Sequence, residues 1–103
     1  PAILRFLKRI TDTTARHRDA ARPVTLGVCG EMGGRRLEAL ALLGLGIRRL
    51  SITPAAIGPI KELICNTDLG EIAAAMDGWL ATPPSDLRGE LTRWAEQRGI
   101  EVE

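Results

Sequence analysis

The sequence predicts an α/β fold in which two short parallel strands alternate with helices. Two observations carry this prediction. The run 24–29 is almost continuously apolar and rich in β-branched residues, and a second short strand pattern begins at residue 49, with one helical pattern in between. That separation of about 25 residues is close to a compact βαβ unit, whose strands are parallel. Because parallel strands are normally buried on both faces and two of them cannot close a sheet, we expect part of a larger α/β sheet or barrel.

Composition places the chain among ordered domains. Of its 103 residues, 45% are hydrophobic and 26% are charged. This balance excludes wholesale disorder, which combines low hydrophobicity with high net charge. No run approaches the ~18 apolar residues of a membrane span, and two cysteines are too few for a disulfide framework. We therefore expect a soluble protein in a reducing, cytoplasmic setting. The chain opens on Pro1 rather than on Met, and we therefore expect a fragment or a processed protein.

The first helix is predicted over residues 1–20. Its apolar stripe follows the 4-3-4 spacing of one helical face, widened by Leu4, and consists of Ile3, Leu7, Ile10 and Thr14. The helix must end before Arg22, because the following Pro23 disfavours helical backbone at its predecessor.

The two strands are predicted over residues 24–29 and 49–53, and Pro54 stops the second. A helix over residues 35–43 lies between them. Glycine favours the positive φ that ends many helices, and the residues expected to end this one are Gly44 and Gly46.

Three further helices are predicted in the second half of the chain. The first begins near Ala56, with an apolar stripe of Ile57, Ile60 and Ile64, and with Cys65 expected in the core. The second is opened by Asp68 and Glu71, a variant of the capping box. The third is capped by Ser85 and closed by Gly99. The apolar stripes of these last two helices are Ile72, Met76 and Trp79, and then Leu87, Leu91 and Trp94.

The net charge of +1 hides an asymmetry between the two halves. Residues 1–50 carry ten Lys/Arg and four Asp/Glu, whereas residues 51–103 carry four and nine. A basic half can attract phosphates or nucleic acid. It can equally be a solvated face that pairs with the acidic half, and the dispersion of the charges favours that interpretation.

Cys29 is the candidate catalytic residue. It lies at the carboxyl end of the first strand, before a glycine-rich loop and a helix. In parallel α/β folds, ligands bind and catalytic groups lie at that end of the strands. The alternative is that Cys29 is a small buried hydrophobic residue.

The loop over residues 30–36 has the flexibility and charge to approach a phosphate. It matches neither the Walker loop nor the dinucleotide-binding fingerprint, so an ordinary strand-to-helix turn remains the alternative. His17 stands between two arginines with no second histidine to form a metal pair, and we expect it to be exposed to solvent.

Three segments together resemble a known family. They are the strand end and loop 24–34, which contains Cys29-Gly30-Glu31, the Gly-Leu-Gly segment 41–47, and the strand 50–53 with the helix start 57–64. This pattern is similar to the C-terminal, phosphoenolpyruvate-binding barrel of Enzyme I of the bacterial phosphotransferase system. Among the forms of that enzyme, the nitrogen-related one resembles it most. Pyruvate phosphate dikinase and phosphoenolpyruvate synthase share the barrel and this strand end.

The resemblance implies that residues 1–103 are a single, helix-rich piece from the end of a (β/α)8 TIM barrel. Residues 1–80 would supply helix six, strand seven with Cys29, helix seven, strand eight with Ser51, and helix eight. Residues 81–103 would form a C-terminal helix. A whole barrel takes ~250 residues, so most of it would lie outside this chain.

The resemblance also implies an activity for the parent protein. Such an enzyme transfers the phosphoryl group of phosphoenolpyruvate to one of its own histidines, and then to a histidine phosphocarrier protein. Cys29 would be the proton donor that converts enolpyruvate to pyruvate, and Gly30 and Glu31 would belong to the substrate loop. The phosphorylated histidine and the ligands of Mg²⁺ would lie upstream of Pro1. The parent would be a cytoplasmic homo-oligomer that binds neither nucleic acid nor membrane.

Two departures from the family pattern accompany the resemblance. Gly33-Gly34-Arg35 stands where Ala-Gly-Asp is frequent, which exchanges an acid for a base beside the active face, and Ser51-Ile52-Thr53 stands where Ser-Met-Ser is frequent. The alternative function from a different class is a small non-enzymatic interaction module. Its basic N-terminal half would bind phosphate-bearing partners.

Overall fold

The computed structural model describes residues 2–16 and 25–103 of the chain. Helices dominate, as expected for this sequence. The elements are α1 (Ala2–Arg16), β1 (Val28–Cys29), η1 (Met32–Gly34, a 3₁₀ turn), α2 (Arg36–Gly44), β2 (Leu50–Ser51), α3 (Pro54–Cys65), α4 (Leu69–Ala81) and α5 (Leu87–Gln97).

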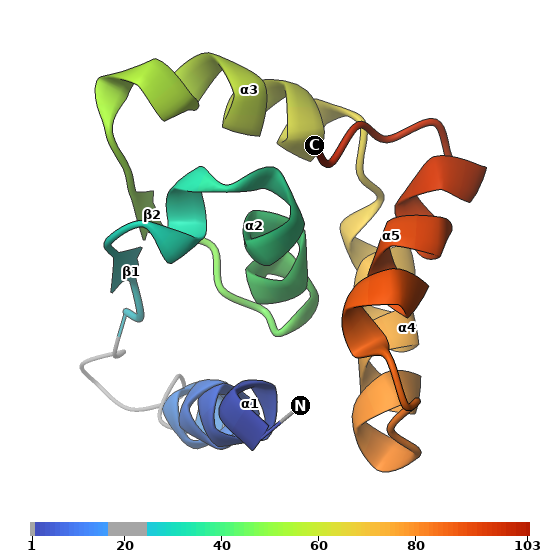
Figure 1. Ribbon diagram of the computed structural model, residues 1–103. Helices are drawn as coiled ribbons and strands as arrows, with labels where there is room; N and C mark the ends of the chain where they lie inside the picture. The colour runs from blue at the N-terminus through green and yellow to red at the C-terminus, as the bar shows by residue number, and fades with distance from the viewer. Residues whose placement is uncertain (1, 17–24) are drawn as a thin grey trace.

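Helix α2 forms the centre of the molecule. The view in Figure 1 places it among α1, α3, the strands and the α4–α5 pair. All six residues from Ala39 to Gly44 are buried, because this segment is apolar on every face and such a helix must be enclosed. The core therefore forms around α2, chiefly where α2 meets α4.

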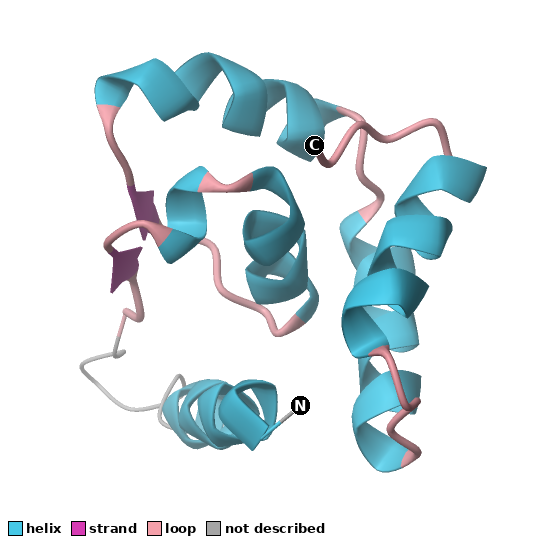
Figure 2. Ribbon diagram, viewed as in Figure 1, coloured by secondary structure: helices cyan, strands magenta, loops and turns pink. Residues whose placement is uncertain are grey.

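The two strands are parallel, as predicted, and pair Val28 with Leu50 and Cys29 with Ser51. Each is two residues long, much shorter than the predicted ranges 24–29 and 49–53. Residues 25–27 and 52–53 have no regular secondary structure, and Val24 lies outside the described residues. Within residues 2–16 and 25–103 each strand has a single neighbouring strand, and it is regular where the two segments pair. Figure 2 shows how small the sheet is beside the helices.

A glycine turn returns the chain from α2 toward β2. Gly46 has a φ of 99°, which a residue with a side chain rarely adopts. Its N–H donates to the Leu43 carbonyl, and the N–H of Ile47 donates to the Leu42 carbonyl. These are the two hydrogen bonds of a Schellman motif, and the residue after the turn, Ile47, is buried, as is common for this motif. The predicted stop at Gly44 and Gly46 is thus confirmed, with Gly44 as the last helical residue.

The predicted apolar stripe of the first helix is wrong at one position. Ile3 is 68% exposed, whereas Leu4 and Leu7 pack against the core. The stripe is therefore rotated from Ile3 toward Leu4. The rest of the predicted range beyond residue 16, His17 included, lies outside the described residues.

The prediction for the third helix also needs correction. Ile60 and Leu63 are its buried residues, while Ile57 and Ile64 are 43% and 40% exposed. Cys65, expected in the core, is exposed. The apolar residues of α3 surround the helix, so spacing alone could not decide which of them face α2.

The C-terminal helices follow their predicted patterns. Buried or core-packed side chains are Ile72, Met76 and Trp79 of α4, and Leu87, Leu91 and Trp94 of α5. Asp68 caps α4 as predicted, accepting from the N–H of Glu71 at 3.0 Å. The cap of α5 is Asp86 rather than the predicted Ser85, and it accepts from the N–H of Gly89 at 3.0 Å.

Candidate functional site

The carboxyl ends of the two strands place Cys29 beside Ser51. The two residues are register partners in the parallel pair, and the N–H of Val28 donates to the Arg49 carbonyl at 2.9 Å. Register partners on neighbouring strands project to the same side of a sheet. Both residues are exposed, whereas Val28 and Leu50 are half-buried and pack against the core.

The chain turns sharply after Cys29. Gly30 has a φ of 105°, a conformation suited to glycine. The next residues form the 3₁₀ turn η1, in which the N–H of Gly34 donates to the Glu31 carbonyl at 3.0 Å. A Cβ on Gly33 would lie 3.3 Å from Ile52 Cγ2, so this glycine lets η1 pack directly against the end of β2.

Cys29 lines a groove of about 730 Å³, named here the Cys29 groove. The interpretation of Cys29 as a buried hydrophobic residue is therefore wrong: the residue is exposed and its thiol is free. The predicted substrate-loop residues Gly30 and Glu31 line the same groove. Its lining residues are Cys29, Gly30, Glu31, Gly34, Arg35, Ser51, Ile52, Thr53 and Ala56.

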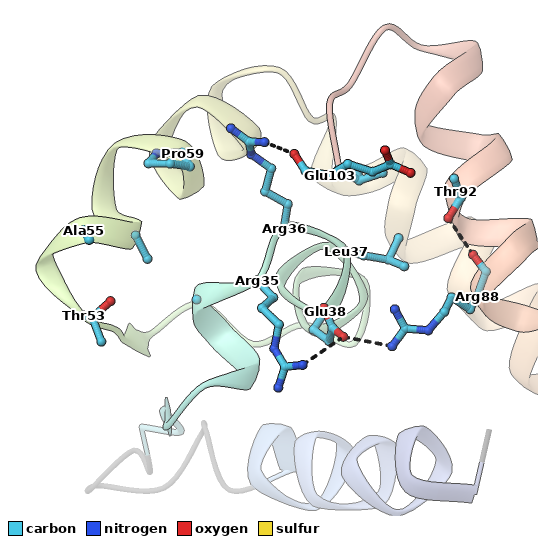
Figure 3. Close-up of a pocket in the computed structure, with 13 residues that line it drawn as sticks. Arg35, Arg36, Leu37, Glu38, Thr53, Ala55, Pro59, Arg88, Thr92 and Glu103 are labelled. Atoms are coloured by element: carbon cyan, nitrogen blue, oxygen red, sulfur yellow. Dashed lines mark hydrogen bonds and ion pairs between the residues drawn. The ribbon is translucent and has the colours of Figure 1, made fainter.

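A second groove, of about 790 Å³, adjoins the first and contains the α2 N-terminus and part of α5 (Figure 3). It is named here the α2–α5 groove. The two grooves share four lining residues, Gly34, Arg35, Thr53 and Ala56. Arg35 therefore borders both.

Three arginines surround the α2–α5 groove, and their pairing differs. Arg36 donates to the Glu103 carbonyl oxygen and lies 3.4 Å from the Glu101 carboxylate. Arg88 donates to Glu38 Oε1 at 2.9 Å. Arg35 lies 4.0 Å from that same oxygen and 3.7 Å from Glu31 Oε2, so both of its ion pairs are longer than a hydrogen bond.

Glu38 is the acidic centre of this arrangement. Its side chain is 15% exposed. Burial by itself would raise the pKa of this carboxyl, but the hydrogen bond from Arg88, together with the charges of Arg88 and Arg35, lowers the pKa below its ordinary value. Glu38 is therefore held ionised and joins α2 to α5.

No metal site is formed within the described part of the chain. Among residues 2–16 and 25–103, no three His, Cys, Asp or Glu side chains converge into a set that could hold a metal ion. The resemblance places the ligands of Mg²⁺ upstream of Pro1, outside this chain. No helix within the same ranges is long and apolar enough to cross a membrane.

The dispersed charges of the N-terminal half pair in part with the acidic half. Lys8 lies 3.5 Å from Asp77, and Arg36 pairs with Glu101 as described. These contacts favour the interpretation of a solvated, internally paired surface over a basic patch for nucleic acid.

Sequence reasoning placed the loop 30–36, with Arg35, beside the active face, but it did not single out Thr53 as a residue that lines the Cys29 groove. Thr53 is the last residue of the predicted second strand, so the sequence could have predicted that it lies at the carboxyl end of that strand. Arg35 was visible as a charge in the loop. Its position beside Ser51 and Thr53 depends on how η1 packs on β2, which the sequence pattern does not encode.

Comparison with known proteins supplies the family context. Residues 1–69 match the family described as PEP-utilising enzyme, PEP-binding domain. A phosphoenolpyruvate-protein phosphotransferase of Borreliella burgdorferi is 39% identical over 64 residues, which are 62% of this chain and 10% of that protein. A multiphosphoryl transfer protein of Rhodobacter capsulatus is 37% identical over 71 residues, which are 69% of this chain and 8% of that protein.

A third relative matches almost the whole chain. An Escherichia coli protein named phosphoenolpyruvate-dependent phosphotransferase system is 30% identical over an alignment of 104 positions, which covers 97% of this chain and 13% of that protein. The chain thus spans about a tenth of the length of the curated relatives it matches. No solved structure matches it significantly.

Proposed function

Because the chain belongs to the PEP-utilising enzymes, within their PEP-binding domain, we propose that it is the C-terminal part of a phosphoenolpyruvate-protein phosphotransferase. The parent protein transfers the phosphoryl group of phosphoenolpyruvate to its own histidine and then to a histidine phosphocarrier protein. The observation that carries this proposal is the exposed Cys29 at a strand end, lining a groove within the matched residues.

Cys29 acts in the second half of the reaction. When the phosphate ester breaks at its P–O bond, enolpyruvate remains, and its terminal carbon must gain a proton to become pyruvate. The thiol donates that proton and is left as a thiolate, which recovers a proton from solvent. A thiol can donate a proton in the forward direction, and its thiolate can accept one in the reverse step. The open groove gives both substrate and water access to the thiol.

The phosphoryl-transfer half uses groups outside this chain. Mg²⁺, with its carboxylate ligands, neutralises charge on the phosphoryl oxygens in reactions of this class. We place its ligands, like the phosphorylated histidine, in the upstream part of the parent. No step within residues 1–103 is assigned to the metal.

The fold completes a (β/α)8 barrel in the parent. A further groove, of about 440 Å³, lies between β2 and α3. Its lining includes Leu50, Ile52, Ile57 and Ile64. Ile57 and Ile64 are strongly exposed for isoleucines, and the β2 edge has unpaired backbone groups suited to a further strand. In this arrangement β1 and β2 are barrel strands seven and eight, and residues 81–103 follow the barrel. The parent is a cytoplasmic homo-oligomer, nearest to the nitrogen-related form.

The test uses the full-length protein with phosphoenolpyruvate labelled in its phosphoryl group. We expect acid-labile label on a protein histidine, together with one pyruvate released for each phosphoryl group transferred. Protein that takes up no label and forms no pyruvate would contradict the proposal. An interaction module of the rival class would instead bind phosphate-bearing polymers without turnover.

A further inference from the structure

Arg36 ties the C-terminal segment of the chain to the first turn of α2. Its Nη1 donates to the carbonyl oxygen of Glu103 and lies 3.4 Å from Glu101 Oε1, and Figure 3 shows the side chain extended toward Glu103. The Arg36 side chain is 22% exposed, so these contacts form at a partly desolvated position. They join residues that are 65 and 67 positions apart in the sequence.

The C-terminal segment 100–103 is directed toward α2 by the turn that ends α5. Gly99 has a φ of 69°, and the N–H groups of Gly99 and Ile100 donate back into the last turn of the helix, as in a Schellman motif. Ile100 is buried in the core, and Val102 packs against it. The segment is therefore held by apolar packing near its start and by the arginine at its end.

The start of α2 is also where the turn after Cys29 ends. The turn η1 finishes at Gly34, two residues before Arg36, and lies against both strands and α3. The N–H of Gly34 donates to the Glu31 carbonyl at 3.0 Å, and both of these residues line the Cys29 groove. A shift in the first turn of α2 would therefore move a wall of that groove.

We propose that Arg36 is a positioning residue for the Cys29 groove. It anchors the segment 100–103 to the start of α2, and this anchor holds η1 in place. The match to the PEP-binding domain ends at residue 69, so the support comes from a part of the chain outside the matched range. Arg36 does not itself line the Cys29 groove, and it acts through η1 rather than on a substrate. The effect on catalysis rests on the proposed function.

Amide hydrogen exchange of the full-length protein tests the anchor without turnover. We expect Arg36→Gln to speed exchange in the segments 100–103 and 30–34 by about fivefold or more, the scale of losing a hydrogen bond to a charged group. A single nitrogen, Nη1, makes both contacts. Arg36→Lys keeps a charged point donor and should restore most of the protection.

Arg98→Gln is the matched control. Arg98 also joins two helices, because it donates to Glu71 of α4 at 2.8 Å, and its other printed acceptor, the Trp94 carbonyl, lies on its own helix. This variant should leave exchange in the segment 30–34 unchanged. Wild-type exchange there in Arg36→Gln would overturn the proposal, because the anchor would not reach η1. An equal rise in Arg98→Gln would overturn it as well, because any lost contact between helices would then loosen η1.

Kinetics of the full-length protein connect the anchor to the reaction. We expect Arg36→Gln to slow pyruvate formation at saturating phosphoenolpyruvate by about fivefold or more, because small displacements of a catalytic group are costly. The burst of histidine phosphorylation should be unchanged, and Arg36→Lys should recover the rate. Pyruvate formation at the wild-type rate in Arg36→Gln, or an equal loss of the burst, would overturn Arg36 as a positioning residue. If the wild-type protein forms no pyruvate, the proposed function fails, and faster exchange of 30–34 in Arg36→Gln would still support the anchor.

Discussion

Cys29 and Ser51, 22 positions apart in the sequence, are register partners at the carboxyl ends of the two parallel strands. Neighbouring strands lie about 4.8 Å apart, so the thiol of Cys29 and the hydroxyl of Ser51 lie side by side in the Cys29 groove. The crossover through α2 produces this pairing, because it returns the chain to the same end of the sheet. The position of the candidate site at this edge of the sheet is therefore a direct consequence of the βαβ topology.

The α2–α4 contact depends on the absence of a side chain at Gly44. A Cβ there would lie 3.2 Å from both Met76 Cβ and Ile72 Cγ1, and 3.3 Å from the Ile72 carbonyl oxygen. We expect Gly44→Ala to destabilise the protein by about 1–2 kcal/mol, because overpacking outweighs the gain in helix propensity. Urea unfolding measures the change in the free energy of unfolding.

Gly78 in α4 is the matched control for Gly44. No described atom lies within 4 Å of a Cβ built on it, so Gly78→Ala should stabilise by about 0.5–1 kcal/mol through helix propensity alone. Equal gains from Gly44→Ala and Gly78→Ala would mean that α4 can move away from α2 at no cost.

The cap of α5 gives a second stability prediction. The Asp86 carboxylate accepts from the Gly89 N–H at 3.0 Å, whereas Ser85 makes no cap. We expect Asp86→Ala to cost about 1 kcal/mol, and Ser85→Ala to stay within about 0.5 kcal/mol of wild type. Thermal unfolding of the two variants side by side decides between the caps, and a larger loss from Ser85→Ala would reassign the helix start.

Glu38 predicts a pH dependence. Its pKa in the folded protein lies below the ordinary value of 4.5, so folding favours the ionised form. The stabilisation is complete above that ordinary value and is lost as the pH falls through it toward the lowered pKa. We expect Glu38→Gln to be less stable than wild type at pH 7 by up to about 1 kcal/mol, and the difference to shrink toward pH 3.

Urea unfolding between pH 7 and pH 3 measures this dependence. Glu96→Gln serves as the control, because Glu96 is exposed on α5 and has no ion pair among the described residues. A difference between wild type and Glu38→Gln that stays constant over the whole range would show that the Arg88 contact does not depend on the charge of Glu38.

The elements that the sequence predicted well are those with a single apolar face and a local signal at each end. In α5, Leu87, Leu91 and Trp94 recur at helical spacing and are all buried. In α3, by contrast, apolar residues occur all round, and which of them are buried depends on the position of α2. Ile57 and Ile64 were consequently predicted on the wrong side.

The residues of the candidate site also differ in whether local sequence or tertiary packing determines their positions. Cys29 could be predicted because strand ends before glycine-rich loops carry chemistry in parallel α/β folds. Gly30 and Glu31 were expected in the substrate loop from the family resemblance, and both line the Cys29 groove. The loop 30–36 was expected beside the active face, but that Arg35 lines one groove with Ser51 could not be predicted, because it requires η1 to pack on β2 at Gly33. Tertiary packing therefore supplies the charge of the groove, and local sequence supplies its thiol.

The most decisive functional prediction concerns Cys29 in the full-length parent. Protonation of enolpyruvate requires a positioned acid, whereas phosphoryl transfer depends on groups upstream of this chain. We therefore expect Cys29→Ala to allow a single phosphorylation of the acceptor histidine but to slow steady-state pyruvate formation by at least ~100-fold, the scale of losing a general acid. Rapid-quench measurement of the phosphohistidine burst, together with coupled detection of pyruvate, separates the two steps.

Cys65→Ala is the matched control, because Cys65 is also free and exposed but lies at the end of α3, outside the Cys29 groove. It should leave both the burst and the turnover unchanged, which removes general effects of thiol loss from the comparison. If Cys29→Ala turned over at the wild-type rate, the proton would come from another group in the groove or from water, and Cys29 would be only a lining residue. If Cys29→Ala abolished the burst as well, the thiol would be needed for phosphoryl transfer itself, and the division of labour between this chain and the upstream part of the parent would be wrong.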